Sequence, residues 1–336
     1  MTDIGPIAWL EHRDGEVAIE ERPDGRRDVT VHPAPEVFVS RSRATTAYPV
    51  ALIAEILRLK GVSYLCDEIA RDEDPDYVER FLRFSLLGYV PEEAFRGERL
   101  LDFGSGSGAS TVRLATMLPD TEIVGVELEA ALIGVARMRA DFYGMAKLRF
   151  QQSPSAHEVS PALGSFRFVN LGAVYEHLLP DERRSVLRQL WARLERGGVM
   201  FVNQLPYRYS PIETHTTGLP LINYVPERWA QVAATRYSRR VSADAQWPQL
   251  LRAGIRGGTA RSVLFDLLRD GGEARLLQPT QMDLRDHADL WFACASADDL
   301  RSSRSRRVTH EISRALSRVA RRPLAPTLNL AFQKLA

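Results

Sequence analysis

The sequence predicts an α/β fold in which a mostly parallel sheet carries helices on both faces. Between residues 99 and 204, short apolar runs alternate with stretches whose apolar residues recur at helical spacing. A glycine-rich loop directly follows the first apolar run. Strands that alternate with crossover helices pair in parallel, and the crossovers cover the faces of the sheet.

The composition is that of an ordinary globular chain. Its 336 residues are 45% hydrophobic and 26% charged, enough for one large core or two modest ones. With 44 basic and 43 acidic residues, the formal net charge of +1 favours neither nucleic acid nor a membrane surface. No window approaches the ~20 apolar residues of a membrane span, and Met1–Pro6 lacks a signal-peptide pattern. We therefore expect a cytoplasmic protein with two reduced cysteines, Cys66 and Cys294.

The N-terminal part is expected to carry a hairpin and a helical collar, in a region that spans residues 1–95. Residues 16–21 and 27–31 alternate apolar and charged side chains around a Pro-Asp-Gly turn, which predicts the hairpin. Residues 48–87 have helical spacing that Gly61 interrupts, which predicts two or three helices that form the collar or a lid.

The main domain is expected at residues 96–205. Its predicted strands are Leu100–Phe103, Glu122–Val126, Lys147–Phe150, Phe166–Leu171 and Val199–Asn203. The predicted helices between them are Ser110–Met117, Ala130–Tyr143 and Asp181–Leu194.

The alternation stops after Gln204. Residues 206–258 are rich in Pro, Tyr, Thr, Arg and Gly, and an irregular segment of this length in a compact domain usually has a function. We therefore expect a substrate-pocket insertion at residues 206–270. Residues 271–336 are expected to add helices and to complete the core sheet.

Arginines concentrate near the C-terminus, at positions Arg301, Arg304, Arg306, Arg307, Arg314, Arg318, Arg321 and Arg322. On a helix, Ile312, Leu316 and Val319 would form a buried stripe while the arginines face solvent. The alternative is attraction of an anionic partner such as a nucleotide sugar, a lipid-linked glycan or RNA. RNA ranks last because no aromatic residues are interleaved with the arginines, and we expect no nucleic-acid partner.

The glycine loop at residues 104–108 predicts an adenosine-containing ligand. It joins a buried strand to a helix, where glycine tolerates positive φ and lets a ligand approach the backbone. Glu127 ends the next strand about 20 residues later, where a carboxylate accepts hydrogen bonds from ribose hydroxyls.

Two ligand classes share this pattern. Gly104, Gly106 and Ala109 also match the dinucleotide fingerprint, which leaves a nicotinamide-dependent oxidoreductase as an alternative. Asp102 favours S-adenosylmethionine (SAM), because a carboxylate so close to the first glycine suits a cationic amino-acid tail better than a pyrophosphate. Gly108 also breaks the dinucleotide spacing. A non-catalytic SAM-binding scaffold is the other alternative.

Residues 99–204 resemble the core of the class I SAM-dependent methyltransferases in four motifs in order: Leu100–Gly108, Val124–Glu127, Phe168–His177 and Leu194–Val202. The resemblance implies a seven-stranded sheet whose last strand, residues 327–335, runs antiparallel. It implies SAM as cofactor and S-adenosylhomocysteine as product. The cofactor contacts it implies are Asp102, Gly104, Ser105, Gly106, Glu127, Leu128, Ser153 and Asn170.

The acceptor is expected at the carboxyl ends of the fourth and fifth strands, where ligands of open parallel sheets bind. A hydroxyl acceptor has to lose a proton, so His177 and His215 are candidate bases, with Glu176 beside them. Each also has a structural alternative, as a helix cap or part of a solvated turn. The candidate substrate contacts are Tyr207, Arg208, Glu213 and Arg256. We expect O-methylation of a hydroxyl on a small molecule, sugar or glycan, and the oligomeric state stays open, with a homodimer allowed.

Metal assistance is a further alternative. The ubiquinone-pathway O-methyltransferases resemble this chain around Glu176-His177, and the resemblance implies a divalent metal held by two glutamates and the histidine. Ala173 stands at the earlier glutamate position, so the site is incomplete unless Glu213 or His215 substitutes. We therefore expect no metal.

Overall fold

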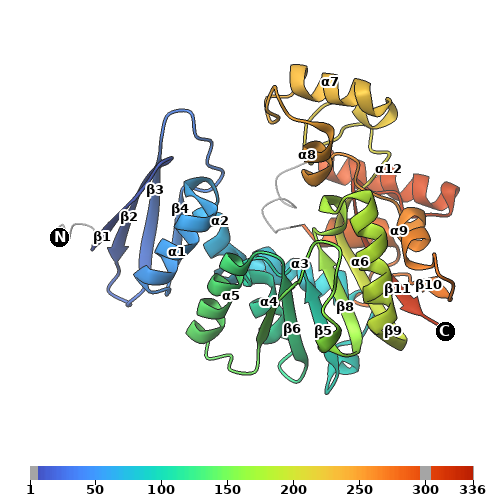
Figure 1. Ribbon diagram of the computed structural model, residues 1–336, viewed down its shortest axis with the longest axis horizontal. Helices are drawn as coiled ribbons and strands as arrows, with labels where there is room; N and C mark the ends of the chain where they lie inside the picture. Colours follow the sequence, from blue (N-terminus) through green and yellow to red (C-terminus); the bar gives the residue numbers. More distant parts are fainter. Residues whose placement is uncertain (1–6, 296–303, 336) are drawn as a thin grey trace.

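A seven-stranded sheet forms the centre of the molecule in the computed structural model, which describes residues 7–295 and 304–335 (Figure 1). Met1–Pro6 and Arg301 therefore lie outside the described residues. The strand order is β10-β11-β9-β8-β5-β6-β7. The strands are β5 (Arg99–Phe103), β6 (Glu122–Glu127), β7 (Arg149–Gln152), β8 (Phe166–Gly172), β9 (Leu194–Pro206), β10 (Ala274–Leu276) and β11 (Thr327–Lys334).

The pairing directions confirm the predicted class of fold. Five neighbouring strands, in the order β7, β6, β5, β8 and β9, pair in parallel. Strand β11 pairs antiparallel with β9, and β10 pairs antiparallel with β11. The sheet is therefore mostly parallel with an antiparallel last strand, as the resemblance implied.

Successive residues of a strand point to opposite faces of the sheet, and helices cover both of these faces. Leu101 faces α6 (Pro180–Arg193) and α9 (Ala260–Leu267), whereas Leu100 faces α4 (Ala109–Met117) and α10 (His287–Ala293). Helix α5 (Ala130–Phe142) packs beside α4 and extends towards the N-terminal part. Short helical turns are η3 (Glu92–Phe95), η4 (Pro161–Leu163), η5 (Tyr175–His177) and η6 (Ile222–Tyr224).

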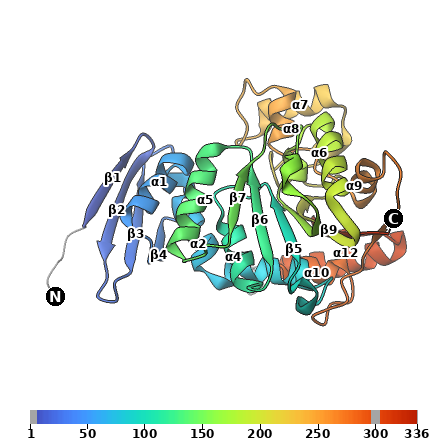
Figure 2. The ribbon, with the colours of Figure 1, turned by 60° about the horizontal axis from the view of Figure 1, so that its bottom comes forward.

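The N-terminal part folds as its own small sheet with two helices, at one end of the molecule in Figures 1 and 2. The predicted hairpin is confirmed, since Val17 pairs opposite Val31. Two flanking strands were not predicted. The strands are β1 (Ala8–His12), β2 (Gly15–Glu21), β3 (Arg27–Pro33) and β4 (Arg43–Thr46).

The predicted collar is also present. Helix α1 (Val50–Lys60) ends at Gly61, whose φ of 70° favours glycine, and α2 (Val62–Glu73) ends before Pro75. Three short helical segments follow: η1 (Pro75–Glu79), α3 (Arg80–Leu82) and η2 (Arg83–Leu87). These turns pack on the same face of the central sheet as α4.

The insertion after β9 is more regular than expected. It contains α7 (Glu227–Tyr237) and α8 (Trp247–Arg252), so the prediction of an irregular segment is wrong at these residues. Helix α7 was not predicted because its buried residues are small. It buries Ala230 and Ala234, while its larger apolar residues face solvent. Both ribbon views show α7 standing away from the central sheet (Figures 1 and 2).

The C-terminal helix α12 (Arg304–Ala320) faces the protein with the side opposite to the predicted one. Ile312 and Leu316 are 54% and 53% exposed, so the expectation of a buried apolar stripe is wrong. The polar side of the helix faces the protein instead, because Arg314 and His310 pair with acidic residues of the α10 region. None of the described helices is both long and apolar enough to span a bilayer.

Candidate functional site

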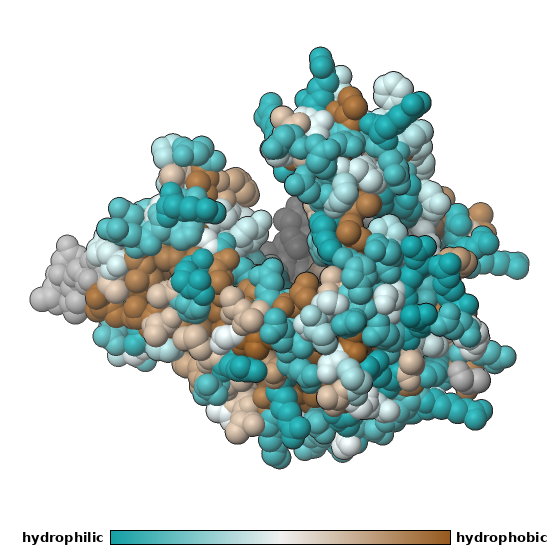
Figure 3. All heavy atoms as spheres, viewed as in Figure 1, coloured by the Kyte–Doolittle hydropathy of each residue, from teal (hydrophilic) through white to brown (hydrophobic). Residues whose placement is uncertain are grey.

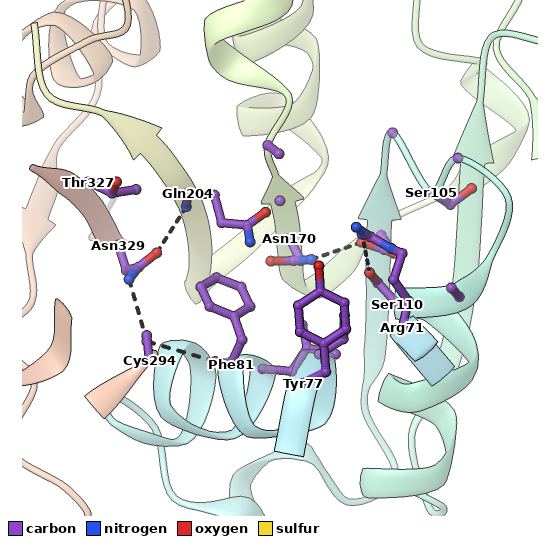
Figure 4. Close-up of a pocket in the computed structure, with 18 of the residues that line it drawn as sticks. Arg71, Tyr77, Phe81, Ser105, Ser110, Asn170, Gln204, Cys294, Thr327 and Asn329 are labelled. Carbon is purple, nitrogen blue, oxygen red and sulfur yellow. Dashed lines mark hydrogen bonds between the residues drawn. The ribbon is translucent and has the colours of Figure 1, made fainter. Parts of the chain in front are cut away.

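A cavity of about 460 Å³ opens beside the glycine loop, at the carboxyl ends of β5, β8 and β9 (Figure 4). Its size lies within the range typical of pockets for small ligands. The collar supplies one wall with Arg71, Tyr77 and Phe81, and α10 and β11 supply another. Figure 3 shows this side of the molecule hollowed between the N-terminal sheet and the insertion.

The three glycines of the loop all have positive φ, of 79°, 55° and 82° at Gly104, Gly106 and Gly108. A Cβ at Gly104 would collide with Val174, and one at Gly108 would lie 2.6 Å from Ala136. A Cβ at Gly106 would meet nothing within 4 Å. Two glycines are therefore required for packing of the protein itself, whereas Gly106 borders open space in the cavity.

Asp102, directly before the glycine loop, forms hydrogen bonds through its side chain. Its carboxylate, 3% exposed, accepts hydrogen bonds from Thr111 Oγ1 at 2.7 Å and Asn170 Nδ2 at 2.8 Å. Burial raises the pKa of Asp102. Asn170 Oδ1 in turn accepts from Asn203 Nδ2, so side chains of β5, β8 and β9 are fixed in one buried chain. The predicted contact of Asp102 with the cofactor stays a prediction.

Glu127 holds the loop from the end of β6. Its carboxylate accepts from the backbone N–H of Gly106 at 2.9 Å, and also from those of Leu128 and Glu129. The Oε2 atom accepts only the Gly106 bond among the described residues, so it has a lone pair left for a ribose hydroxyl.

Ser153 lies beside the end of the same strand. Its backbone N–H donates to the carbonyl oxygen of Glu127 at 2.8 Å. Its Oγ is engaged with the carbonyls of Ser155 and Glu158 within its own loop. The side chain therefore stabilises this loop, and the predicted contact of Ser153 with the adenine stays a prediction.

The loop residues fit an adenosyl cofactor. Ser105 is buried, yet its Oγ has no hydrogen-bond partner among the described residues, and it lines the cavity (Figure 4). A buried hydroxyl without a partner is costly unless a ligand or water satisfies it. Together with the open space at Gly106 and the free lone pair of Glu127, this hydroxyl indicates a place for a polar ligand along the loop.

The wall opposite the loop contains polar residues that the sequence patterns did not indicate as site residues. Gln204 has a φ of 60°, an uncommon conformation for a residue with a side chain, and its backbone N–H donates to Asn329 Oδ1 at 2.9 Å. Asn329 Nδ2 lies 3.5 Å from Cys294 Sγ (Figure 4). An asparagine inside the apolar strand β11 was the sequence signal that could have identified this wall.

A buried ion network behind the loop was also missed. Arg139 on α5 is fully buried and donates to Glu68 Oε2 at 3.2 Å, while its Nη1 lies 3.9 Å from Asp72. Glu68 also accepts a hydrogen bond from the hydroxyl of Ser107 in the glycine loop. Burial acts to raise the pKa of Glu68, but the charges of Arg139, Arg71 and Lys60 and the hydrogen bond from Ser107 together outweigh it and lower that pKa. The network therefore connects α5, the collar and the loop.

The three predicted catalytic residues lie together, but none of them lines the cavity. Glu176 is fully buried, and neither of its carboxylate oxygens has a hydrogen-bond partner among the described residues. Burial raises its pKa to about 8. His177 Nε2 lies 3.8 Å from Glu176 Oε1, and the rings of His177 and His215 are 5.3 Å apart. Their catalytic roles stay predictions.

This cluster has the geometry of a metal-binding group. One ligand atom from each of Glu176, His177 and His215 lies within 4.8 Å of the others. His177 Nδ1 donates to the backbone carbonyl of Arg252 at 2.6 Å, so Nε2 is the ring nitrogen left to bind a cation. Metal-bound histidines are commonly oriented in this way by the second ring nitrogen. Glu213, the other residue considered for this role, accepts from the backbone N–H groups of residues 215–217 instead.

The four predicted substrate contacts lie in the insertion, and none of them lines the cavity. Arg208 donates to the carbonyl of Asn223, and Arg256 donates to carbonyls of residues 222, 223 and 225. Together with Tyr207 and Glu213, Arg256 borders a pocket of only about 10 Å³. The observed bonds therefore stabilise the insertion, and the substrate roles stay predictions.

Comparison with known proteins identifies one shared region. Residues 100–198 match a family model described as a methyltransferase domain. The chain is 31% identical over 121 residues to a trans-aconitate 2-methyltransferase of Deinococcus radiodurans, covering 36% of this chain and 42% of the relative. It is 27% identical over 146 residues to a carboxy-S-adenosyl-L-methionine synthase of Chromohalobacter salexigens, covering 39% and 50%. The chain thus spans about half the length of these curated relatives.

One solved structure with similarity over most of the chain is described as StiE O-MT residues 961–1257. It covers 84% of this chain and 81% of its own, with 14% identity and a TM-score of 0.43.

Proposed function

We propose, on the premise that residues 100–198, which match a methyltransferase domain, form a class I SAM-dependent methyltransferase domain, that the protein transfers the methyl group of SAM to an acceptor in the cavity. The observation that carries this proposal is that the glycine loop and the opposite wall, with Gln204 and Asn329, border the same cavity. The domain match favours SAM over the nicotinamide cofactor of the alternative oxidoreductase.

The chain's own residues have binding and positioning roles in this proposal. Bound SAM supplies a methyl group that its sulfonium already activates. Glu127 would accept hydrogen bonds from the ribose hydroxyls, and Ser105 Oγ would bond to the part of the cofactor that lies along the loop. Since methyl transfer depends mainly on alignment, the rigid Asp102 network would keep the loop in one position.

The cavity favours an acidic acceptor. Lys60, Arg71 and Arg306 are among its lining residues, and none of the described lining residues is a histidine. The two acids among the described lining residues are already engaged: Glu68 pairs with Arg139, and Asp102 accepts two hydrogen bonds. A carboxylate acceptor is ionised at neutral pH and needs no base, whereas the expected hydroxyl acceptor does.

We therefore favour O-methylation of a carboxylate on a small molecule over the hydroxyl of a small molecule, sugar or glycan. The name of the Deinococcus radiodurans relative, trans-aconitate 2-methyltransferase, supports an acidic small molecule. The test is incubation of the purified protein with methyl-labelled SAM and parallel panels of carboxylic acids, phenols and sugars. Labelled methyl esters are the expected product, and transfer to sugars or phenols alone would contradict the carboxylate.

Arg71→Gln is expected to raise the KM for an acidic acceptor about tenfold or more, with a smaller change in kcat. Arg71 is held only loosely, at 3.4 Å from Ser110 Oγ and 4.0 Å from Glu68, so its charge is available to a ligand. A lost charge-assisted contact of about 1.5–3 kcal/mol corresponds to that factor. Arg58→Gln is the matched control, because Arg58 is exposed on α1 and does not line the cavity. An unchanged KM in the Arg71 variant would remove this residue from acceptor binding.

The non-catalytic scaffold differs from this proposal in one measurable respect. A scaffold would bind SAM yet transfer no label to any acid, phenol or sugar in the panels. Product formation by the wild-type protein would exclude it.

A second proposal concerns Glu176, His177 and His215, which have the donor set of a site for a divalent cation of the zinc class. Two imidazoles and one carboxylate suit such cations, and the unpartnered carboxylate of Glu176 would gain a counter-charge. Because His215 belongs to the insertion and Glu176 to η5, the cation would hold the insertion on the core. This role differs from the sequence-based expectation that no metal is bound.

Titration of the chelator-treated protein with Co²⁺, followed by its visible absorption, tests the cluster. We expect one equivalent to bind, and we expect His215→Ala to weaken binding by about 10- to 100-fold or more. His157→Ala is the matched control, since His157 is half-exposed and pairs only distantly with Asp181 at 4.0 Å. Equal affinity in the His215 variant, or no binding by the wild type, would contradict the site.

A further inference from the structure

Helix α12 presents an apolar stripe to solvent. Val308, Ile312, Leu316 and Val319 are 53%, 54%, 53% and 85% exposed. Their spacing of four, four and three residues places them on one side of the helix. Single exposed apolar residues are ordinary, but a contiguous stripe on one helix marks a surface that contacts something else.

The opposite side of α12 is fixed to the protein by polar contacts. His310 Nε2 lies 2.9 Å from Asp289 Oδ1, and Arg314 Nε lies 3.4 Å from Asp286 Oδ2. Ser313, between them on this side, is 7% exposed. A rotation that buried the apolar stripe would break these charged contacts. The stripe is therefore outward because the ion pairs with the α10 region require it.

Arginines accompany the stripe. Arg304, Arg307 and Arg318 are exposed, and at 100° per residue they lie together on one side of the stripe, with Glu311 among them. Glu311 is the one acidic residue of α12, so this edge keeps a positive charge. Arginine keeps its guanidinium at a polar boundary while its aliphatic stem lies along apolar surface. The combination of an apolar face with a basic edge is typical of helices that lie in the interface of a membrane.

The charge of this surface favours an anionic membrane over a second copy of the chain. A second copy of the chain that packed antiparallel on this surface would bring two arginine edges together, where like charges repel. A bilayer with anionic lipid offers phosphates to the arginines and acyl chains to the stripe, without any matched pocket.

We propose that α12 docks the protein on membranes that contain anionic phospholipid, with the stripe inserted between the headgroups and the arginines on the phosphates. Arg306 of the same helix lines the cavity, so docking would bring the cavity close to the membrane surface. The docking itself rests on the geometry of α12 and not on the proposed methyl transfer.

Sedimentation of the full-length protein with phosphatidylcholine vesicles, with and without phosphatidylglycerol, tests the proposal. We expect binding to the anionic vesicles only, and we expect it to weaken as ionic strength rises from about 0.1 M to 1 M. Arg304→Gln, Arg307→Gln and Arg318→Gln together should weaken binding about a hundredfold, since each basic residue near an anionic surface contributes a factor of about five.

Ile312→Ser with Leu316→Ser is expected to abolish vesicle binding and to leave the thermal unfolding unchanged, because both side chains face solvent. Phe38→Ser with Phe265→Ser is the matched control, since these residues, in the β3–β4 connection and on α9, are 82% and 67% exposed. Three results would overturn the proposal: no binding to anionic vesicles, binding that the Ile312 and Leu316 changes leave intact, or a dimer in light scattering that these changes dissociate.

Discussion

Replacing Arg139 with alanine is expected to lower the free energy of unfolding by about 3–5 kcal/mol, the largest effect on stability that we predict. Arg139 is fully buried, and its guanidinium is the cation that faces both Glu68 and Asp72. Without it, two buried carboxylates would lose the cation that they share. Removal of one partner of a buried ion pair is costly because the other charge is left uncompensated.

Urea unfolding followed by circular dichroism measures this effect. Arg58→Ala is the control, because Arg58 forms an exposed pair with Glu55 on α1 and its loss should change stability little. Adding Glu68→Gln and Asp72→Asn to an Arg139→Leu variant should recover part of the lost stability, since no uncompensated charge then remains. A loss below about 1 kcal/mol in the alanine variant would show that the network is not a stabilising unit.

The second large effect is expected at Gly106, where alanine should weaken SAM binding about 10- to 100-fold. The Cβ of alanine would meet no protein atom within 4 Å, so it would occupy space that the cofactor is proposed to fill. A steric conflict of about 1–3 kcal/mol corresponds to that factor. The φ of 55° adds backbone strain of about 1–2 kcal/mol, which lowers stability as well.

The Gly97→Ala variant separates the loss of SAM affinity from the loss of stability. Gly97 has a φ of 73° and also has no neighbour within 4 Å of an added Cβ, but it does not line the cavity. Both variants should therefore lose similar stability, and only Gly106→Ala should lose affinity in isothermal titration with SAM. Equal affinities in the two variants would show that the cofactor does not approach Gly106.

The central sheet could be predicted because its signals are local. Alternating strand and helix patterns, a glycine loop and an acidic strand end are all short patterns within residues 99–204, and the structure confirms the sheet that they indicate. The antiparallel last strand followed only from the family resemblance, since it pairs with β9, which lies more than a hundred residues earlier.

Long-range contacts explain what the sequence did not reveal. The outward stripe of α12 depends on Asp286 and Asp289, which belong to another element, so the helix pattern alone indicated the wrong face. The helix α7 was missed because its buried positions are alanines. His177 and His215 were chosen by type and loop position, but η5 and the insertion direct them to Glu176 and not into the cavity.

The central claim is that the cavity beside the glycine loop receives SAM, and titration calorimetry of the wild-type protein tests it most directly. We predict saturable binding of SAM and of S-adenosylhomocysteine with one site per chain, and no binding of NAD under the same conditions. Binding of NAD without binding of SAM would contradict the account.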